Sequence, residues 1–99
     1  MSLCTEHGVI GILQDGKIIA YGKNREVYAS PGQGIAIAFL VSIPDLRKVD
    51  YVIHIQFDTD PVCDPGTAVN KSIRGNVVGM TIIGLAAGTT LDVTVVAVG

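Results

Sequence analysis

The sequence has little charge, and the charge that it has carries no basic excess. Only 16% of its 99 residues are charged, and the formal net charge is −2. Proteins that bind nucleic acid or an anionic membrane surface through charge need clustered Lys and Arg to attract the phosphates. We therefore expect no nucleic acid and no membrane among its partners.

Long hydrophobic runs are also missing. The run "GIAIAFLVSI" at 34–43 is about half of the roughly 20 residues that a membrane-spanning helix needs. Glu6 and His7 stand where a signal peptide would have a basic segment followed by a long apolar stretch. The sequence thus predicts a cytoplasmic or virion protein with no signal peptide and no transmembrane segment. Residues 1–3 fit a cloning remnant, and no functional weight is placed on them.

Cysteine is scarce as well, with Cys4 and Cys63 as its two occurrences. Neither lies in the spacing of a redox or zinc motif, and a small scaffold held by disulfides normally carries more cysteines. We expect two thiols rather than one disulfide.

What the chain has in abundance is Val and Ile, 25 residues together, with 12 glycines. Because these residues favour strands and turns and no 3.6-residue periodicity is sustained, the sequence predicts an all-β fold. Its length fits a single domain over residues 1–99.

Strands and turns can be placed from the local patterns. Asp15-Gly16 between apolar runs predicts a β-hairpin at 8–21 with a type I′ turn, followed by a solvated connector at 22–34. Alternation predicts strands at 35–43 and 49–57, and 76–85 and 89–99 read as two more. Residues 58–76 read as one long connection with a short strand near 68–73. The expected core consists of Ile37, Phe39, Tyr51, Ile53, Ile55, Phe57, Val93 and Val95.

Residues 84–99 resemble a corner found in fibronectin type III and related immunoglobulin-like modules. There a Leu, a Pro-Gly-Thr turn and a Tyr enter the penultimate strand; here Ala87 and Leu91 replace the proline and the tyrosine. The resemblance implies an antiparallel β-sandwich that is immunoglobulin-like, and a small β-barrel is the alternative. The family continues into one further strand, so we expect the final strand to pair with the N-terminal hairpin or with another copy. The glycine-rich, aromatic-poor composition also resembles that of phage structural proteins.

Asp58, Asp60 and Asp64 are the only candidate metal ligands, because clustered carboxylates suit Ca²⁺. Their spacing is not that of an EF-hand, and Asp-Pro pairs are ordinary turn formers. The sequence predicts no cofactor and no resident metal.

Catalytic residue types occur without a catalytic arrangement. His54 could pair with one of these aspartates, and Cys63 could pair with His7 or His54 as a nucleophile and its base. Nothing in the sequence brings them together, and "SPGQG" at 30–34 lacks the lysine of a phosphate-binding loop. We expect no enzymatic activity.

Apolar residues opposite the core sets indicate an interface instead. One small sandwich cannot hide all of them, so the sequence predicts homo-oligomers formed through strand faces and edges. The expected function is a structural or assembly module, of the kind found in phage particles, with other structural proteins of a particle as further partners. The alternative is a small ligand- or calcium-binding module that uses residues 58–76 as a binding loop. The predicted interface residues are Ala36, Ala38, Leu40, Val52, Val96 and Val98.

Overall fold

The computed structural model describes residues 4–27, 37–60, 66–83 and 88–99 of the chain. All regular structure in these ranges is β, as predicted, and they contain no helix that is long and apolar enough to cross a membrane. The strands are β1 (Glu6–Ile12), β2 (Ile18–Val27), β3 (Ile37–Ser42), β4 (Tyr51–Asp60), β5 (Gly66–Arg74), β6 (Val77–Ile83) and β7 (Thr90–Val98).

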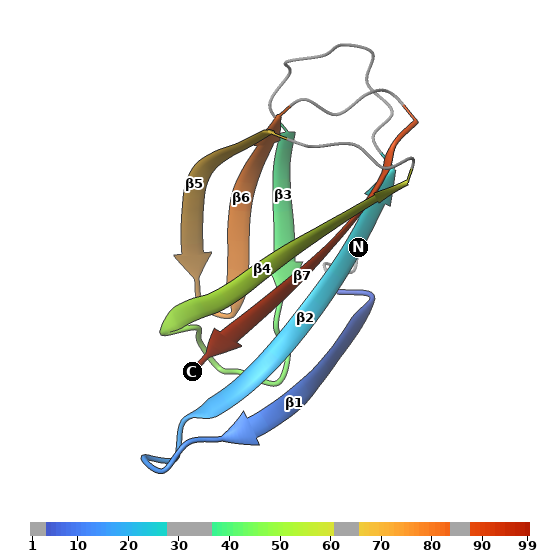
Figure 1. Cartoon of the computed structure of the whole chain (residues 1–99). Coiled ribbons are helices and arrows are strands. Elements are labelled where there is room, and N and C mark those ends of the chain that lie inside the picture. Colours follow the sequence, from blue (N-terminus) through green and yellow to red (C-terminus); the bar gives the residue numbers. More distant parts are fainter. Residues whose placement is uncertain (1–3, 28–36, 61–65, 84–87) are drawn as a thin grey trace.

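The strands form two antiparallel sheets. The four-stranded sheet has the order β1-β2-β7-β4, and the three-stranded sheet has the order β3-β6-β5. Figure 1 shows the two sheets as separate layers, with the strands of the larger sheet running at an angle to those of the smaller. The arrangement is compatible with a β-sandwich.

The last strand lies inside the four-stranded sheet. β7 pairs with β2 on one side and with β4 on the other, so the expected pairing with the N-terminal hairpin is confirmed and β7 has no unpaired edge. An immunoglobulin constant domain would have the orders 1-2-5-4 and 3-6-7. Here β7 and β5 occupy each other's places in that scheme, so the likeness of the 84–99 segment does not extend to the strand order.

The core lies between the two sheets and is mainly aliphatic. Phe39, Val93 and Val95 are fully buried, as predicted, while Ile55 and Phe57 are half-buried and pack against this core. The side chain of Ile37, also predicted in the core, lies outside the described residues. The remaining buried hydrophobic residues include Ala20, Val41, Ile43, Leu46, Val49, Val78, Met80, Ile82, Leu91 and Ala97.

The prediction that Tyr51 and Ile53 lie in the core is wrong. Both side chains are about half exposed, whereas Val52 packs against the core. The cause is a β-bulge: β4 pairs regularly with β7 on both sides of Ile53, but the register shifts by one residue between Val52 and His54. An extra residue inverts the alternation of side chains, so a strict period of two assigns half of this strand to the wrong face.

The N-terminal hairpin is confirmed, but its turn differs from the predicted type I′. The Gly16 amide donates to the Leu13 carbonyl at 3.0 Å, and the Leu13 amide donates to the Lys17 carbonyl at 2.7 Å. Gly16 has a φ of +90°, and none of the described residues other than glycine has a positive φ. The loop therefore has three residues, 14–16, in which a type I turn is followed by a residue in the left-handed conformation. Only that last position, Gly16, requires glycine.

In two segments interpreted as connections, the described residues are largely strand. β2 continues through the polar residues 22–27 because β7 pairs with it along its whole length, up to Val27 opposite Thr90. Within 58–76, residues 58–60 belong to β4 and residues 66–74 form β5, which pairs with β6. Backbone pairing across the sheet has outweighed the turn-forming composition of both segments.

The two layers approach each other most closely where β2 passes β3. The amide nitrogen of the buried Asn24 side chain donates to the Leu40 carbonyl at 2.8 Å. Two residues earlier, a Cβ added to Gly22 would collide with the Ser42 carbonyl oxygen. This contact explains a glycine in the middle of a long strand, since only a residue without a side chain permits such proximity of two backbones.

Phe39→Ala should lower the free energy of unfolding by about 3 to 5 kcal/mol, because it leaves a cavity in a fully buried site. Tyr51→Ala is the matched control and should cost well under half as much, since the Tyr51 side chain is half exposed. Urea unfolding of both variants measures the difference. Equal losses would show that the faces of β4 are assigned incorrectly.

Gly22→Ala should also destabilise the fold, although it adds only one methyl group. The new Cβ meets backbone oxygen rather than a side chain that could turn away, so β2 and β3 must move apart. Gly11→Ala, with nothing within 4 Å of the added Cβ, is the control. Thermal melting should show a clearly lower Tm for Gly22→Ala alone; matching melting curves for the two variants would contradict the close approach.

Candidate interaction surface

The outer face of the four-stranded sheet, which points away from the core, carries an apolar band at one end. Register partners in a sheet share a face, so the rows across the strands can be followed residue by residue. One row joins Tyr51 to Val98 and Ile19, and the next joins His54 to Val96 and Tyr21. Ile53 adds an exposed aliphatic side chain at the bulge between these rows.

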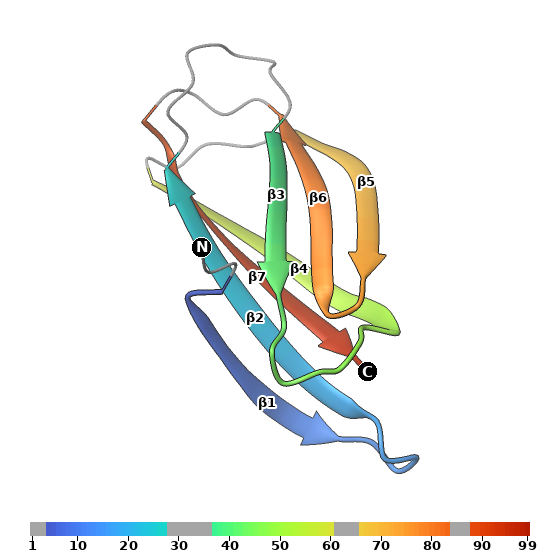
Figure 2. The ribbon, with the colours of Figure 1, turned by 180° about the vertical axis from the view of Figure 1, so that it is seen from behind.

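The edge strand β1, at the opposite margin of the sheet from β4, also has exposed apolar side chains. Its side chains Val9, Ile10 and Ile12 are 53%, 57% and 73% exposed. Figure 2 shows β1 at the margin of the sheet, next to β2 only. Like β4, this strand has a bulge, because its register with β2 shifts between Val9 and Gly11.

The opposite end of the same outer face is polar. Asp58, Asp92 and Arg25 form one row across β4, β7 and β2, and Arg25 Nη2 lies 3.2 Å from Asp92 Oδ2. Asp92 Oδ1 is buried and has no hydrogen-bond partner among the described residues. Shallow hollows of about 270 and 350 Å³ lie beside this ion pair, lined by Glu6 and Lys23 on one side and by Asp58 with neighbouring threonines on the other.

Polar contacts fix the edge strand β1 to its neighbours. The Tyr21 hydroxyl donates to Glu6 Oε2 at 3.1 Å, and this hydrogen bond raises the pKa of Tyr21 above its usual value. On the other face, His7 Nδ1 lies 2.7 Å from Asp45 Oδ2 in the segment between β3 and β4. These contacts position β1 firmly beside β2 while its outer backbone edge stays unpaired within the described part of the chain.

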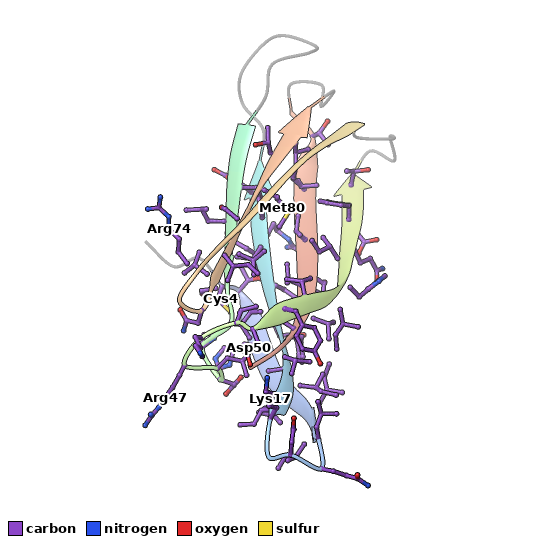
Figure 3. All side chains as sticks on the ribbon, turned by 90° about the vertical axis from the view of Figure 1, so that its left-hand side faces the viewer. Cys4, Lys17, Arg47, Asp50, Arg74 and Met80 are labelled. Atoms are coloured by element: carbon purple, nitrogen blue, oxygen red, sulfur yellow. The ribbon has the colours of Figure 1, made fainter. Side chains whose placement is uncertain are left out.

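A second charged cluster borders the apolar end of the sheet. Lys17 Nζ lies 2.6 Å from Asp50 Oδ2, and Lys48 Nζ lies 3.7 Å from Asp50 Oδ1. Figure 3 shows Lys17 and Asp50 close together, whereas Arg47 projects away from the body of the protein. The hydrogen bond from Lys17 holds the pKa of Asp50 below its usual value, and the same bond raises the pKa of Lys17. The apolar band therefore has charged groups at both ends.

The predicted interface residues fall in different places. Val96 lies half-buried on the outer face of the apolar band, and Leu40 is exposed on the three-stranded sheet. Val52 packs against the core, so its assignment to the face opposite the core is wrong, and Val98 is fully buried within the chain. Val52 changes face because of the bulge, and Val98 is covered although it lies in the outer row between Tyr51 and Ile19. Ala36 and the side chain of Ala38 lie outside the described residues.

Leu40 borders a separate hollow on the outer face of the three-stranded sheet. The hollow has a volume of about 470 Å³ and is lined by Leu40, Ser72, Arg74, Val77 and Gly79. Gly79 fits here without a side chain, since an added Cβ would lie 2.7 Å from Ser72 Oγ.

The described candidate metal and catalytic residues lie in different places. Asp58 is exposed on the polar row, while Asp64 and the side chain of Asp60 lie outside the described residues. Within the described ranges, no group of three or more His, Cys, Asp or Glu side chains could hold a metal ion. His54 is exposed on β4, and His7 pairs with Asp45 on β1. Cys63 lies outside the described residues, and Cys4 is half-buried with its Sγ 3.1 Å from the Glu6 carbonyl.

The surface residues that sequence reasoning missed are Tyr51 and Ile53, which it placed in the core. A hint was present in the pattern, because Val52 interrupts the polar face of this strand. A bulge is a property of strand pairing, however, and the pattern of one strand does not reveal it.

No family model, curated protein or solved structure matches the chain.

Asp50→Asn should lower the Tm at neutral pH, and the difference from the unsubstituted protein should shrink in acid. A carboxylate whose pKa is depressed in the folded state adds stability above its unfolded pKa and loses it as the pH falls through the folded pKa. The difference should therefore diminish below about pH 4. When Lys17 is replaced by Gln, the further substitution Asp50→Asn should lower the Tm at pH 7 by much less, because the ion pair is already lost. A Tm difference that is constant from pH 7 to acid would argue against the ion pair.

Proposed function

We propose that this protein is a non-enzymatic β-sandwich module that assembles with copies of itself into a larger structure. The larger structure proposed is a phage particle, and the support for it is the resemblance of the composition to that of phage structural proteins. The chemistry of the described surface supports this proposal better than a role in binding a small ligand.

The observation that carries the proposal is where the exposed apolar side chains lie. Of the seven large hydrophobic residues that are exposed in the described part of the chain, five lie on β1 and β4, the two edges of one sheet. Exposed apolar residues that gather in this way mark interaction sites, because burying them removes apolar surface from water. An edge strand adds unpaired backbone groups that a further strand can satisfy.

The charged groups around this surface also fit an interface. Lys17, Lys48 and Asp50 border one end of the apolar band, and Arg25, Asp92 and Asp58 border the other. Protein interfaces commonly have an apolar centre surrounded by a polar rim. The charged ends would keep the free subunit from associating at random and favour one arrangement of the partner.

A ligand- or calcium-binding function has less support. The segment 58–76, predicted as a binding loop, contributes its described residues mainly to β4 and β5. The described acidic side chains form no group of three that could surround a cation.

Light scattering coupled to size exclusion tests the assembly function directly. At concentrations on the order of micromolar and above, the average mass should exceed the 10.3 kDa of one chain and should rise with concentration, because association follows mass action. A monomer at every concentration would contradict the proposal. Val98→Asp is unsuitable as an interface variant because Val98 is buried within the subunit and its loss would unfold the chain.

A further inference from the structure

We propose that the four-stranded sheet continues from one copy of the chain into the next, with β1 of one copy adding beside β4 of its neighbour. The inference rests on the assembly function proposed above and specifies its geometry. The partner is a second copy in the same orientation, and the contact is a backbone ladder between two different edges.

The polarity of the sheet permits this joint. Each of the three strand pairs in the order β1-β2-β7-β4 is antiparallel, so the two edge strands run in opposite directions. A second copy moved sideways without being turned over therefore brings its β4 antiparallel to β1 of the first. Antiparallel addition of this kind would form a backbone ladder between residues 51–56 of one copy and residues 6–11 of the other.

The two edges also hold the same number of residues between two shared rows of the sheet. Followed across the sheet, Tyr51 lies in the same row as Gly11, and His54 lies in the same row as Gly8. Between these two rows β4 has the residues 51 to 54 and β1 has the residues 8 to 11, so each edge holds four residues over the same interval. The two central strands hold only three there, Ile19 to Tyr21 on β2 and Val96 to Val98 on β7.

The two edges hold equal numbers of residues in this interval because each has a bulge. This agreement favours β4 of another copy as the partner of β1. Each edge carries one extra residue relative to its inner neighbour, in the interval between the same two rows. A bulged edge discourages the addition of a regular strand, because the extra residue displaces the hydrogen-bonding groups from the ladder. Another edge with an extra residue in the same interval is in register with the first at both ends of that interval. The chain supplies that edge itself.

The side chains that face each other across this joint are compatible. With Tyr51 opposite Gly11 and His54 opposite Gly8 of the neighbouring copy, four aliphatic residues meet between these two rows. Val52 lies in the same row as Val9, and the extra residues are Ile53 on β4 and Ile10 on β1. Cross-strand aliphatic pairs of this kind stabilise a sheet. Further along, Gln56 faces Glu6 of the neighbouring copy, so that acid meets a neutral partner there.

Because the joint uses two different edges, every copy retains one free β1 edge and one free β4 edge. Such head-to-tail contacts produce a ring when the rotation between copies closes and an open filament when it does not.

The test uses one substitution on each edge and then mixes the two variants. A lysine on an exposed edge strand opposes strand addition, so Ile10→Lys and Ile53→Lys should each be monomeric in light scattering. In an equimolar mixture, the intact β4 edge of Ile10→Lys can still join the intact β1 edge of Ile53→Lys. The mixture should therefore form a species of about twice the monomer mass and nothing larger.

Controls separate folding from assembly. Both isoleucines are more than half exposed, so thermal melting should show folded variants, and Val9→Lys replaces Ile10→Lys if that variant does not fold. Ile73→Lys places the same charge on the edge of the other sheet and should assemble like the unsubstituted protein.

The other outcomes overturn the joint in distinguishable ways. Assembly that persists in Ile53→Lys but not in Ile10→Lys would indicate a symmetric pairing of two β1 edges. Assembly that persists in both variants, or a mixture that stays monomeric, would place the contact elsewhere and leave the assembly function standing. An unsubstituted protein that is monomeric throughout would refute both proposals.

Discussion

The structure depends on the insertion of β7 between β2 and β4. Its inward residues Leu91, Val93, Val95 and Ala97 are at most 1% exposed, and its backbone is paired on both sides over nearly its whole length. The pairing continues to the last residue, because Gly99 and Ile18 exchange two backbone hydrogen bonds of 2.9 and 3.0 Å. A Cβ on Gly99 would collide with the Lys48 carbonyl oxygen, so this end of the strand is closely enclosed.

This insertion decides which strands are left at the edges. With β7 in the middle, the N-terminal β1 and the bulged β4 become the two margins of the sheet. The even number of strands makes these margins antiparallel to each other, and the bulges give them the same residue count. The exposed apolar side chains of the sheet are thus a consequence of topology as well as of composition.

Packing between the layers adds a second constraint on the same strands. The Asn24 side chain and the close approach at Gly22 connect β2 to β3, and Lys17 with Asp50 connects the start of β2 to the start of β4. β2 therefore has contacts with both layers and with the loop before β4. A surface that must meet a second subunit in a defined register requires such fixed neighbours, because a mobile edge would lose entropy on binding.

The sequence by itself determined the fold class, the N-terminal hairpin and the inner position of Phe39 on β3 and of Val93 and Val95 on β7. These features depend on local pattern: Val and Ile favour strands, Asp15-Gly16 favours a turn, and the alternation around Phe39 and Val93 selects the buried face. Only the tertiary structure decided the strand order, the extension of β2 through residues 22–27 and the conversion of most of 58–76 into strand. It also decided the outward position of Tyr51 and Ile53 and the burial of Val98. The physical reason is that pairing partners and bulges are set by backbone hydrogen bonds between distant segments, and these bonds can outweigh the preferences of any single segment.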